Sequence, residues 1–280
     1  MNSLNHKIDF AAIFSVHNAN PNGDPLNGNR PRENYDGHGE ISDVCIKRKL
    51  RNRLQDFGTH IFVKSDDRAD DGFQSLQGRL NSIEKLKDEK DRNVFSQVAC
   101  ETWLDVRSFG QVFAFKGSDM SVGVRGPVTV QSAFSVLPID INSMQITKSV
   151  NSVLGDKKTS DTMGSKHCVP FALYVTHGSI NCQLAEKTGF SEEDAQAIHK
   201  ALLSLFENDA SSARPEGSME VVKVIWWEHN CKSGQYSSAK VHRALHVAAR
   251  AGVEEPHCVE DYEITVDPLE GLIPQIENGI

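Results

Sequence analysis

The chain has 280 residues, which is enough for one elaborated domain or two modest ones with a substantial hydrophobic core. Its apolar runs are far shorter than the roughly 18 residues of a membrane-spanning helix, so we expect no membrane association. The first residues do not resemble a signal peptide, and the six cysteines include no C-x-x-C pair. We therefore expect reduced thiols and a cytoplasmic protein without a cofactor.

The net charge of −8 is distributed unevenly. Residues 251–280 contain eight acidic residues and no Lys or Arg, so the first 250 residues carry 30 acidic and 30 basic residues. Within them, residues 41–54 hold five cations and one acid. Because binding depends on local clustering, this distribution argues against non-specific duplex binding and leaves room for a confined single-strand site.

The first predicted elements are a buried strand at 7–17, a polar loop at 18–40 and a helix at 41–57. The loop is rich in Asn, Gly and Pro, which disfavour regular structure and permit left-handed backbone. Ser42 is the expected N-cap of the helix. The apolar face of the helix is expected to hold Ile46, Leu50, Leu54 and Phe57.

Another face of this helix gathers cations directly after the loop. Lys47, Arg48 and Arg51 lie together on a 3.6-residue wheel. They either bind a phosphate chain or form a solvated face, and the preceding loop favours phosphate binding. Arg30 and Arg32 in the loop either extend this site or contact nearby carbonyl groups.

The middle of the chain reads as an insertion followed by strands. Residues 64–93 have helical spacing and dense charge, which predicts a surface insertion, with disorder of its DDRADDG part as the alternative. Residues 103–115 and 122–136 are strand-like, with glycines that indicate bulges or a close backbone approach. The polar residues 140–168 predict a projecting hairpin or loop.

The remaining elements are a strand at 169–180, a helix that Ser191 caps, and a last strand at 220–227. Without insertions, the elements follow the order β-α-β-β-α-β, which predicts an α+β fold with an open antiparallel sheet. Such a sheet often binds single-stranded RNA. Trp226 and Trp227 face opposite sides of the last strand. We expect one of them in the core and the other against a helix or a neighbouring subunit.

Several motifs follow one another in an order typical of one family. They are N-x-N-P-N-G-D-P (18–25), R-P-R (30–32), ISDVCIKRKLRN (41–52), DVRSFGQVFAF, VRGPVTVQSAF, MGSKHCVPFALYVTHG and LAEKTGFSEED. With them the chain resembles the backbone subunit of type I CRISPR effector complexes, the Cas7 family, and specifically its type I-C version.

The resemblance implies a ferredoxin-like, RRM-like palm with a helical fingers insertion and a protruding thumb. The fingers would span 58–100 and the thumb 140–168. The palm would comprise 1–57, 101–139 and 169–250. An acidic C-terminal segment, 251–280, would follow, and it could mimic nucleic acid, dock a neighbour or promote solubility.

The resemblance also implies a non-enzymatic role in antiviral defence. Several copies would form a helical filament along one guide RNA (crRNA) and hold it for pairing with target DNA. Other subunits of the complex, Cascade, would join them, and a separate nuclease-helicase would degrade the DNA.

A subunit that must hold any spacer sequence should contact phosphate and ribose. Arg125 could face an RNA backbone that lies against the glycines around it, and Met163 is the one apolar residue near the thumb tip that could displace a base. The predicted RNA-binding residues are Asn20, Asn22, Arg30, Arg32, Ser42, Lys47, Arg48, Arg51, Arg125, Met163 and Lys166.

Two other functions stay open. Asp24 could support metal-dependent RNA cleavage, as in type III relatives, although no second carboxylate or histidine is suitably spaced to share a metal. The chain could also be a stand-alone single-stranded RNA chaperone. His167–Cys168 and His257–Cys258 lack two further ligands at zinc-site spacing, so we expect no zinc there.

Overall fold

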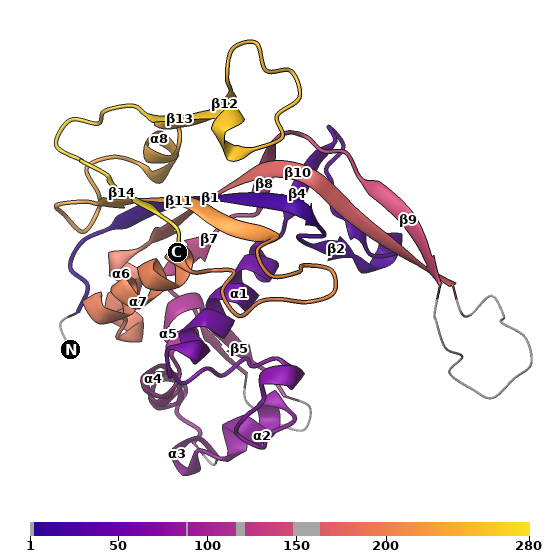
Figure 1. Ribbon diagram of the computed structural model, residues 1–280. Coiled ribbons are helices and arrows are strands. Elements are labelled where there is room, and N and C mark those ends of the chain that lie inside the picture. Colours follow the sequence, from indigo (N-terminus) through magenta and orange to yellow (C-terminus); the bar gives the residue numbers. More distant parts are fainter. Residues whose placement is uncertain (1–2, 88, 116–120, 148–162) are drawn as a thin grey trace, which may run out of the picture.

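A computed structural model describes residues 3–87, 89–115, 121–147 and 163–280. Its centre is an eight-stranded antiparallel sheet in the order β14-β11-β1-β10-β8-β4, with β7 and β9 also paired to β10 (Figure 1). The strands are β1 (Ile8–Ala19), β4 (His38–Ile41), β7 (Val128–Val130), β8 (Ala133–Pro138), β9 (Asn142–Thr147), β10 (Met163–Ile180), β11 (Met219–Glu228) and β14 (Gln275–Asn278).

The first strand lies at the middle of this sheet. β1 pairs with β10 on one side and with β11 on the other, and its residues 8–16 are all buried. This explains its nearly continuous apolar sequence, because a strand that is covered on both faces has no reason to alternate. The predicted strands at 7–17, 169–180 and 220–227 are confirmed.

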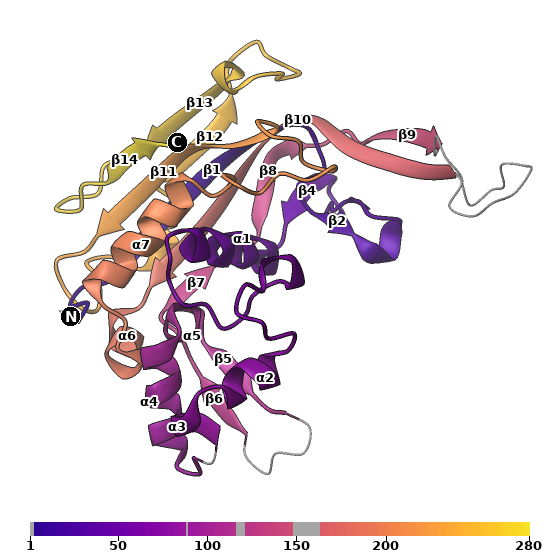
Figure 2. The same cartoon turned by 60° about the horizontal axis from the view of Figure 1, so that its bottom comes forward.

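Helices cover one face of the sheet. They are α1 (Asp43–Asp56), α6 (Cys182–Thr188) and α7 (Glu192–Leu203), and Figure 2 shows α1 and α7 side by side. Both long helices begin at the predicted caps, with Ser42 accepting from the Cys45 amide and Ser191 forming a capping box with Asp194. The buried residues of α1 include the predicted Ile46, Leu50 and Leu54, and Phe57 packs beside them.

The opposite face is not open, contrary to the prediction from the sequence. The segment after β11 folds back over it as α8 (Ser238–His242), β12 (Leu245–Ala249) and β13 (Tyr262–Val266) (Figure 1). Trp226 packs on the helix side and Trp227 on this second side, and both are fully buried. The prediction that 220–227 is the last strand was wrong, since β12, β13 and β14 follow it.

The C-terminal segment 251–280 is therefore part of the fold. Tyr262 and Leu272 lie in the second core, and β14 pairs with β11 at the edge of the sheet. Alternation along Tyr262–Val266 was the available sign of a strand, with Tyr262 buried and Glu263 exposed.

A separate hydrophobic cluster holds the insertion together. It joins Phe62, Phe95, Trp103, Phe113 and Val122. Its helices are α2 (Leu76–Asn81), α3 (Glu84–Lys87), α4 (Arg92–Thr102) and α5 (Leu104–Phe109), and its strands are β5 (Gln111–Phe113) and β6 (Val122–Val124). Its packing thus extends beyond residue 100, where the sequence analysis ends the fingers.

The strand expected at 103–115 is a helix, α5, followed by the short β5. The reason lies in Asp105, in the first turn of α5. Its carboxylate is 1% exposed and accepts from the amides of Phe62 and Val63 at 2.7 and 3.1 Å. Apolar runs of this length do not distinguish a buried strand from a buried helix, and this long-range contact decides for the helix.

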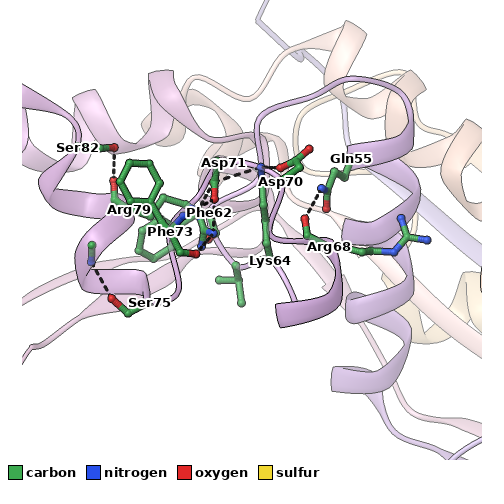
Figure 3. Close-up of polar contacts among 12 residues, drawn as sticks. Gln55, Phe62, Lys64, Arg68, Asp70, Asp71, Phe73, Ser75, Arg79 and Ser82 are labelled. Carbon is green, nitrogen blue, oxygen red and sulfur yellow. Dashed lines mark hydrogen bonds and ion pairs between the residues drawn. The ribbon is translucent and has the colours of Figure 1, made fainter.

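The acid-rich DDRADDG segment is ordered by ion pairs (Figure 3). Asp71 receives both Nε and Nη2 of the buried Arg79, at 2.6 and 2.9 Å, and Arg79 Nη1 donates to the Phe62 carbonyl at 2.8 Å. Lys64 lies 3.3 Å from Asp71. The structure therefore favours an ordered segment over disorder, because Asp70 and Asp71 have cationic partners within the insertion.

The polar residues 140–168 include two strands of a hairpin. Residues Asn142 to Thr147 pair with Cys168 to Met163, and Figure 1 shows this hairpin extending away from the body. Residues 148–162 lie outside the described residues. No helix in the described part of the chain is long and apolar enough to cross a membrane.

Candidate nucleic-acid interface

Hydrogen bonds of its asparagine side chains stabilise the loop before α1. Asn20 is 3% exposed and donates to the Asn29 carbonyl at 2.7 Å, where Gly28 and Asn29 adopt left-handed backbone with φ of 59°. Asn22 accepts from both the amide and the hydroxyl of Ser42, at 3.0 and 2.9 Å. Asn22 therefore ties the loop to the start of α1.

Two short strands, β2 (Gly23–Asp24) and β3 (Arg30–Pro31), close this loop, with the 3-10 helix Pro25–Asn27 between them. Asp24 caps that helix by accepting from the Leu26 amide at 3.1 Å, and Arg32 lies 3.6 Å from the same carboxylate. Among the described residues, Asp24 belongs to no group of possible metal ligands. Its contacts give it a structural role in the turn.

The three cations of α1 that the sequence analysis grouped on one face all have partners within the chain. Lys47 pairs with Asp43 at 3.0 Å, one turn away. Arg48 donates to the Val63 carbonyl at 2.6 Å. Arg51 pairs with the buried Asp105 at 2.9 Å and lies over the ring of Phe109.

The strength of these contacts determines how easily each cation could bind phosphate instead. The i,i+4 pair of Lys47 is partly exposed, and such pairs contribute only about 0.3–0.5 kcal/mol, so Lys47 can exchange its partner easily. Arg51 cannot leave without stranding a buried carboxylate. Sequence reasoning treated the three as equal, because Asp105 is 54 residues from Arg51.

A cleft of about 620 Å³ lies along the other flank of α1. Its basic residues are Arg48, Lys49, Arg68 and Arg214, against Asp67 and Asp209. Lys49 is buried against Asp209, and burial lowers the pKa of its ammonium group although Asp209 opposes that shift. Sequence reasoning missed this cleft, since Arg68 and Arg214 come from distant segments without a motif.

The loop also contacts the projecting hairpin. Arg30 Nη1 donates to the Ser143 hydroxyl at 2.8 Å, and His167 Nδ1 lies 2.9 Å from the same oxygen. Arg30 thus joins β3 to the base of the hairpin. Loop, helix start and hairpin form one continuous surface.

Exposed apolar side chains mark the hairpin itself. Met144, Ile146 and Met163 are 48%, 49% and 56% exposed. Lys166 is opposite Met144 and Met163 is opposite Thr147 in the pairing register. Met163 and Lys166 therefore point to opposite faces of the hairpin, because side chains alternate along a strand.

Arg125 lies outside the loop, α1 and the hairpin, which hold the other predicted residues. It is exposed and follows β6 directly. Gly126 beside it and Gly110 approach each other so closely that a Cβ on Gly126 would lie 2.3 Å from the Ser108 carbonyl oxygen. These two glycines thus accommodate a close approach of two segments of the chain.

Comparison with known proteins agrees with this architecture. A Cas7 protein from Haloferax volcanii is 25% identical over 254 residues, covering 84% of this chain and 74% of that protein. A chain of a pre-nicking CRISPR RNA-guided surveillance complex superposes with a TM-score of 0.50 at 15% identity, covering 79% of this chain and 78% of its own length. A chain of another such complex gives a TM-score of 0.43 at 18% identity, covering 79% of this chain and 68% of its own.

The sequence profile of the family described as "CRISPR-associated protein Cas7" matches residues 6–267. This match includes the main sheet except β14, together with the insertion, the hairpin and most of the C-terminal layer. The chain therefore belongs to the Cas7 family of CRISPR-associated proteins.

Proposed function

We propose that this chain is the RNA-binding backbone subunit of a type I-C CRISPR surveillance complex. Its family membership supports this role, and its motifs support the subtype. In this proposal the main sheet with α1 and α7 is a ferredoxin-like, RRM-like palm, the insertion forms the fingers, and the β9–β10 hairpin is the thumb.

The observation that carries the proposal is the continuous surface of the loop, α1 and the hairpin. Arg30 bridges from β3 to Ser143 in the hairpin, and Asn22 joins the loop to Ser42 at the start of α1. Lys47 and Arg48 are the cations of the helix on this surface, and Met163 shares the hairpin face of Ser143, whereas Lys166 points to the other face. A single RNA strand could therefore run from the helix to the hairpin along phosphate-binding groups.

The sheet itself is not the RNA platform in this proposal. The C-terminal layer buries Ala11, Ile13 and Trp227 on the face that an RNA-recognition domain leaves open. Contacts therefore go to phosphate and ribose at the edge of the sheet, which suits a protein that must accept any guide sequence.

Several copies would stack along one guide RNA and hold it for pairing with target DNA. Other subunits of the complex and a separate nuclease-helicase would act on this assembly, while this chain performs no catalysis. The contacts of Asp24 support a role without catalysis, because its carboxylate accepts a hydrogen bond from the Leu26 amide and pairs with Arg32. Met163, at the start of β10, is the proposed residue that displaces a base.

The test is the mass of the purified chain mixed with single-stranded RNAs of increasing length and unrelated sequence. A filament predicts one more subunit for each fixed increment of nucleotides, and dissociation at high salt. One subunit at every length would contradict the backbone role and favour an RNA chaperone. RNA fragments would instead point to a nuclease.

A further inference from the structure

The N-terminal end of β1 carries a second candidate site, remote from the loop and the hairpin in the fold (Figure 1). Ser3 forms a bridge with Ser191, and the Leu4 amide donates to the Phe190 carbonyl. The first described residues therefore run beside the start of α7. In the same region Ile8 pairs with Glu228 at the end of β11.

These pairings bring three possible metal ligands together from distant parts of the sequence. The ligand atoms of His6, Glu192 and Glu228 all lie within 4.8 Å of one another. His6 Nε2 is 4.0 Å from a Glu228 oxygen. His6 lies in the bend just before β1, and Glu192 is the first residue of α7.

The histidine is oriented as a metal ligand would be. Its Nδ1 lies 3.0 Å from Asn5 Oδ1, which can only accept, so Nδ1 carries the proton of that bond. In the neutral ring, Nε2 then holds the free lone pair, and this atom is buried without a hydrogen-bond partner in the described structure. A second hydrogen bond that fixes the tautomer is usual for histidines that bind metal ions.

Within the described part of the chain, neither carboxylate has a Lys or Arg within 4.0 Å. Glu192 lies in the first turn of α7, where the free amides favour a negative charge, and the side chain of Glu228 is 43% exposed. Glu228 Oε1 accepts from the Trp226 indole at 3.0 Å, which orients the carboxylate and leaves Oε2 toward His6. Two carboxylates and one lone pair thus lie within reach of a single cation.

We propose that His6, Glu192 and Glu228 bind one Zn²⁺ ion that joins the starts of β1 and α7 to the end of β11. Imidazole nitrogen favours zinc over Mg²⁺ or Ca²⁺, which prefer oxygen ligands. Zinc ligands in a tetrahedral site stand about 3.3 Å apart, so small side-chain rotations close the observed spacing. Water completes the coordination.

The experiment uses the full chain without an affinity tag, freed of metal by a chelator that is then removed. Zn²⁺ is titrated in competition with a chromophoric chelator, and Mg²⁺ is titrated in parallel. We expect one Zn²⁺ per chain, a higher unfolding temperature with Zn²⁺, and no comparable effect of Mg²⁺.

Variants distinguish this site from adventitious binding. His6→Gln and Glu192→Gln should each weaken Zn²⁺ binding at least tenfold, and Asn5→Ala should weaken it about tenfold by freeing the ring. The control is His246→Gln, because His246 pairs with Asp267 at 2.8 Å on the exposed C-terminal layer without a third ligand.

Circular dichroism of the metal-free variants shows whether they remain folded. The proposal is overturned if the wild-type chain binds Zn²⁺ no more tightly than His6→Gln, in which case His6 and Glu228 form an ion pair only. Equal losses in His246→Gln and His6→Gln would overturn it as well.

Discussion

At the scale of single residues, partners within the chain decide which cations are available to RNA. Lys47 forms one partly exposed ion pair, whereas Arg51 stabilises the buried Asp105 and stacks on Phe109. The same helix face therefore combines a binding residue and a structural residue. A charge-reversal experiment on Arg51 would confuse the two roles.

We therefore predict different results for neighbouring substitutions. Lys47→Gln should weaken RNA binding and reduce the slope of log affinity against log salt by about 0.7, as expected for one lost phosphate contact to a single strand. Arg51→Gln should instead lower the free energy of unfolding by roughly 3 kcal/mol, because Asp105 loses its cation. RNA titrations at several salt concentrations and urea denaturation measure the two effects.

Lys187→Gln on α6 is the matched control, since Lys187 is exposed on another helix of the same layer. It should change neither the salt slope nor the stability. An unchanged salt slope in Lys47→Gln would contradict the proposed path of the RNA along α1.

At the scale of elements, the insertion depends on ion pairs as well as on its apolar cluster. Asp71 and Arg79 form a bidentate pair, and Arg79 also holds the Phe62 carbonyl at the edge of that cluster (Figure 3). The pair thus connects the acid-rich segment to the core of the insertion. Such fork-to-fork geometry is among the strongest hydrogen-bonded arrangements in proteins.

This pair predicts a specific dependence of stability on pH. The hydrogen bonds from Arg79 hold the pKa of the Asp71 carboxyl well below its ordinary value. A carboxyl with a depressed folded-state pKa stabilises the fold above its unfolded pKa of about 3.9, and this contribution disappears as the pH falls through the lower folded pKa. Asp71→Asn should therefore cost roughly 2 kcal/mol at pH 7 and much less at pH 2.

Urea denaturation of the wild-type chain and of Asp71→Asn at pH 7 and at low pH measures this difference. Asp66→Asn in the same segment is the control, because no ion pair of Asp66 occurs in the described structure. An equal cost of Asp71→Asn at both pH values would show that its effect is not due to the carboxylate charge.

At the scale of the whole molecule, the C-terminal layer turns an open sheet into a sheet that is covered on both faces. It buries Ile13, Ile225 and Trp227, and β14 extends the sheet beyond β11. The acidic residues of this segment face outward, as Glu263 does in β13. The apolar side chains of the acidic segment are therefore buried in the second core, and its charged side chains lie on the surface.

Two adjacent residues test this description. Leu272 is 1% exposed in the second core, whereas Ile273 is 88% exposed. Leu272→Ala should lower the free energy of unfolding by roughly 3 kcal/mol, and Ile273→Ala should change it by less than about 0.5 kcal/mol. Equal, small effects in thermal and urea denaturation would mean that the segment is a loosely attached tail.

The amino-acid sequence by itself determined the local elements whose signals are local. Ser42 and Ser191 mark their helices because a cap needs only residues of the next turn, and the long apolar runs of β1 and β11 mark buried strands. The turn around Gly28 and Asn29 was also predictable, since these residues adopt left-handed backbone, whereas the strand β4 at the end of the expected loop was not predicted. Family motifs then indicated the overall type of protein.

Only the tertiary structure decided what depends on contacts between distant residues. The contacts of Asp105 with Phe62 and Val63 accompany a helix where a strand was expected, and the segment after β11 covers the sheet face that was expected to be open. The ion pair with Asp105 makes Arg51 a structural residue, unlike Lys47. The cleft beside α1 and the group of His6, Glu192 and Glu228 likewise combine residues more than 140 positions apart. Local sequence patterns do not predict such pairs, because burial and charge compensation arise only when the folded chain brings distant residues together.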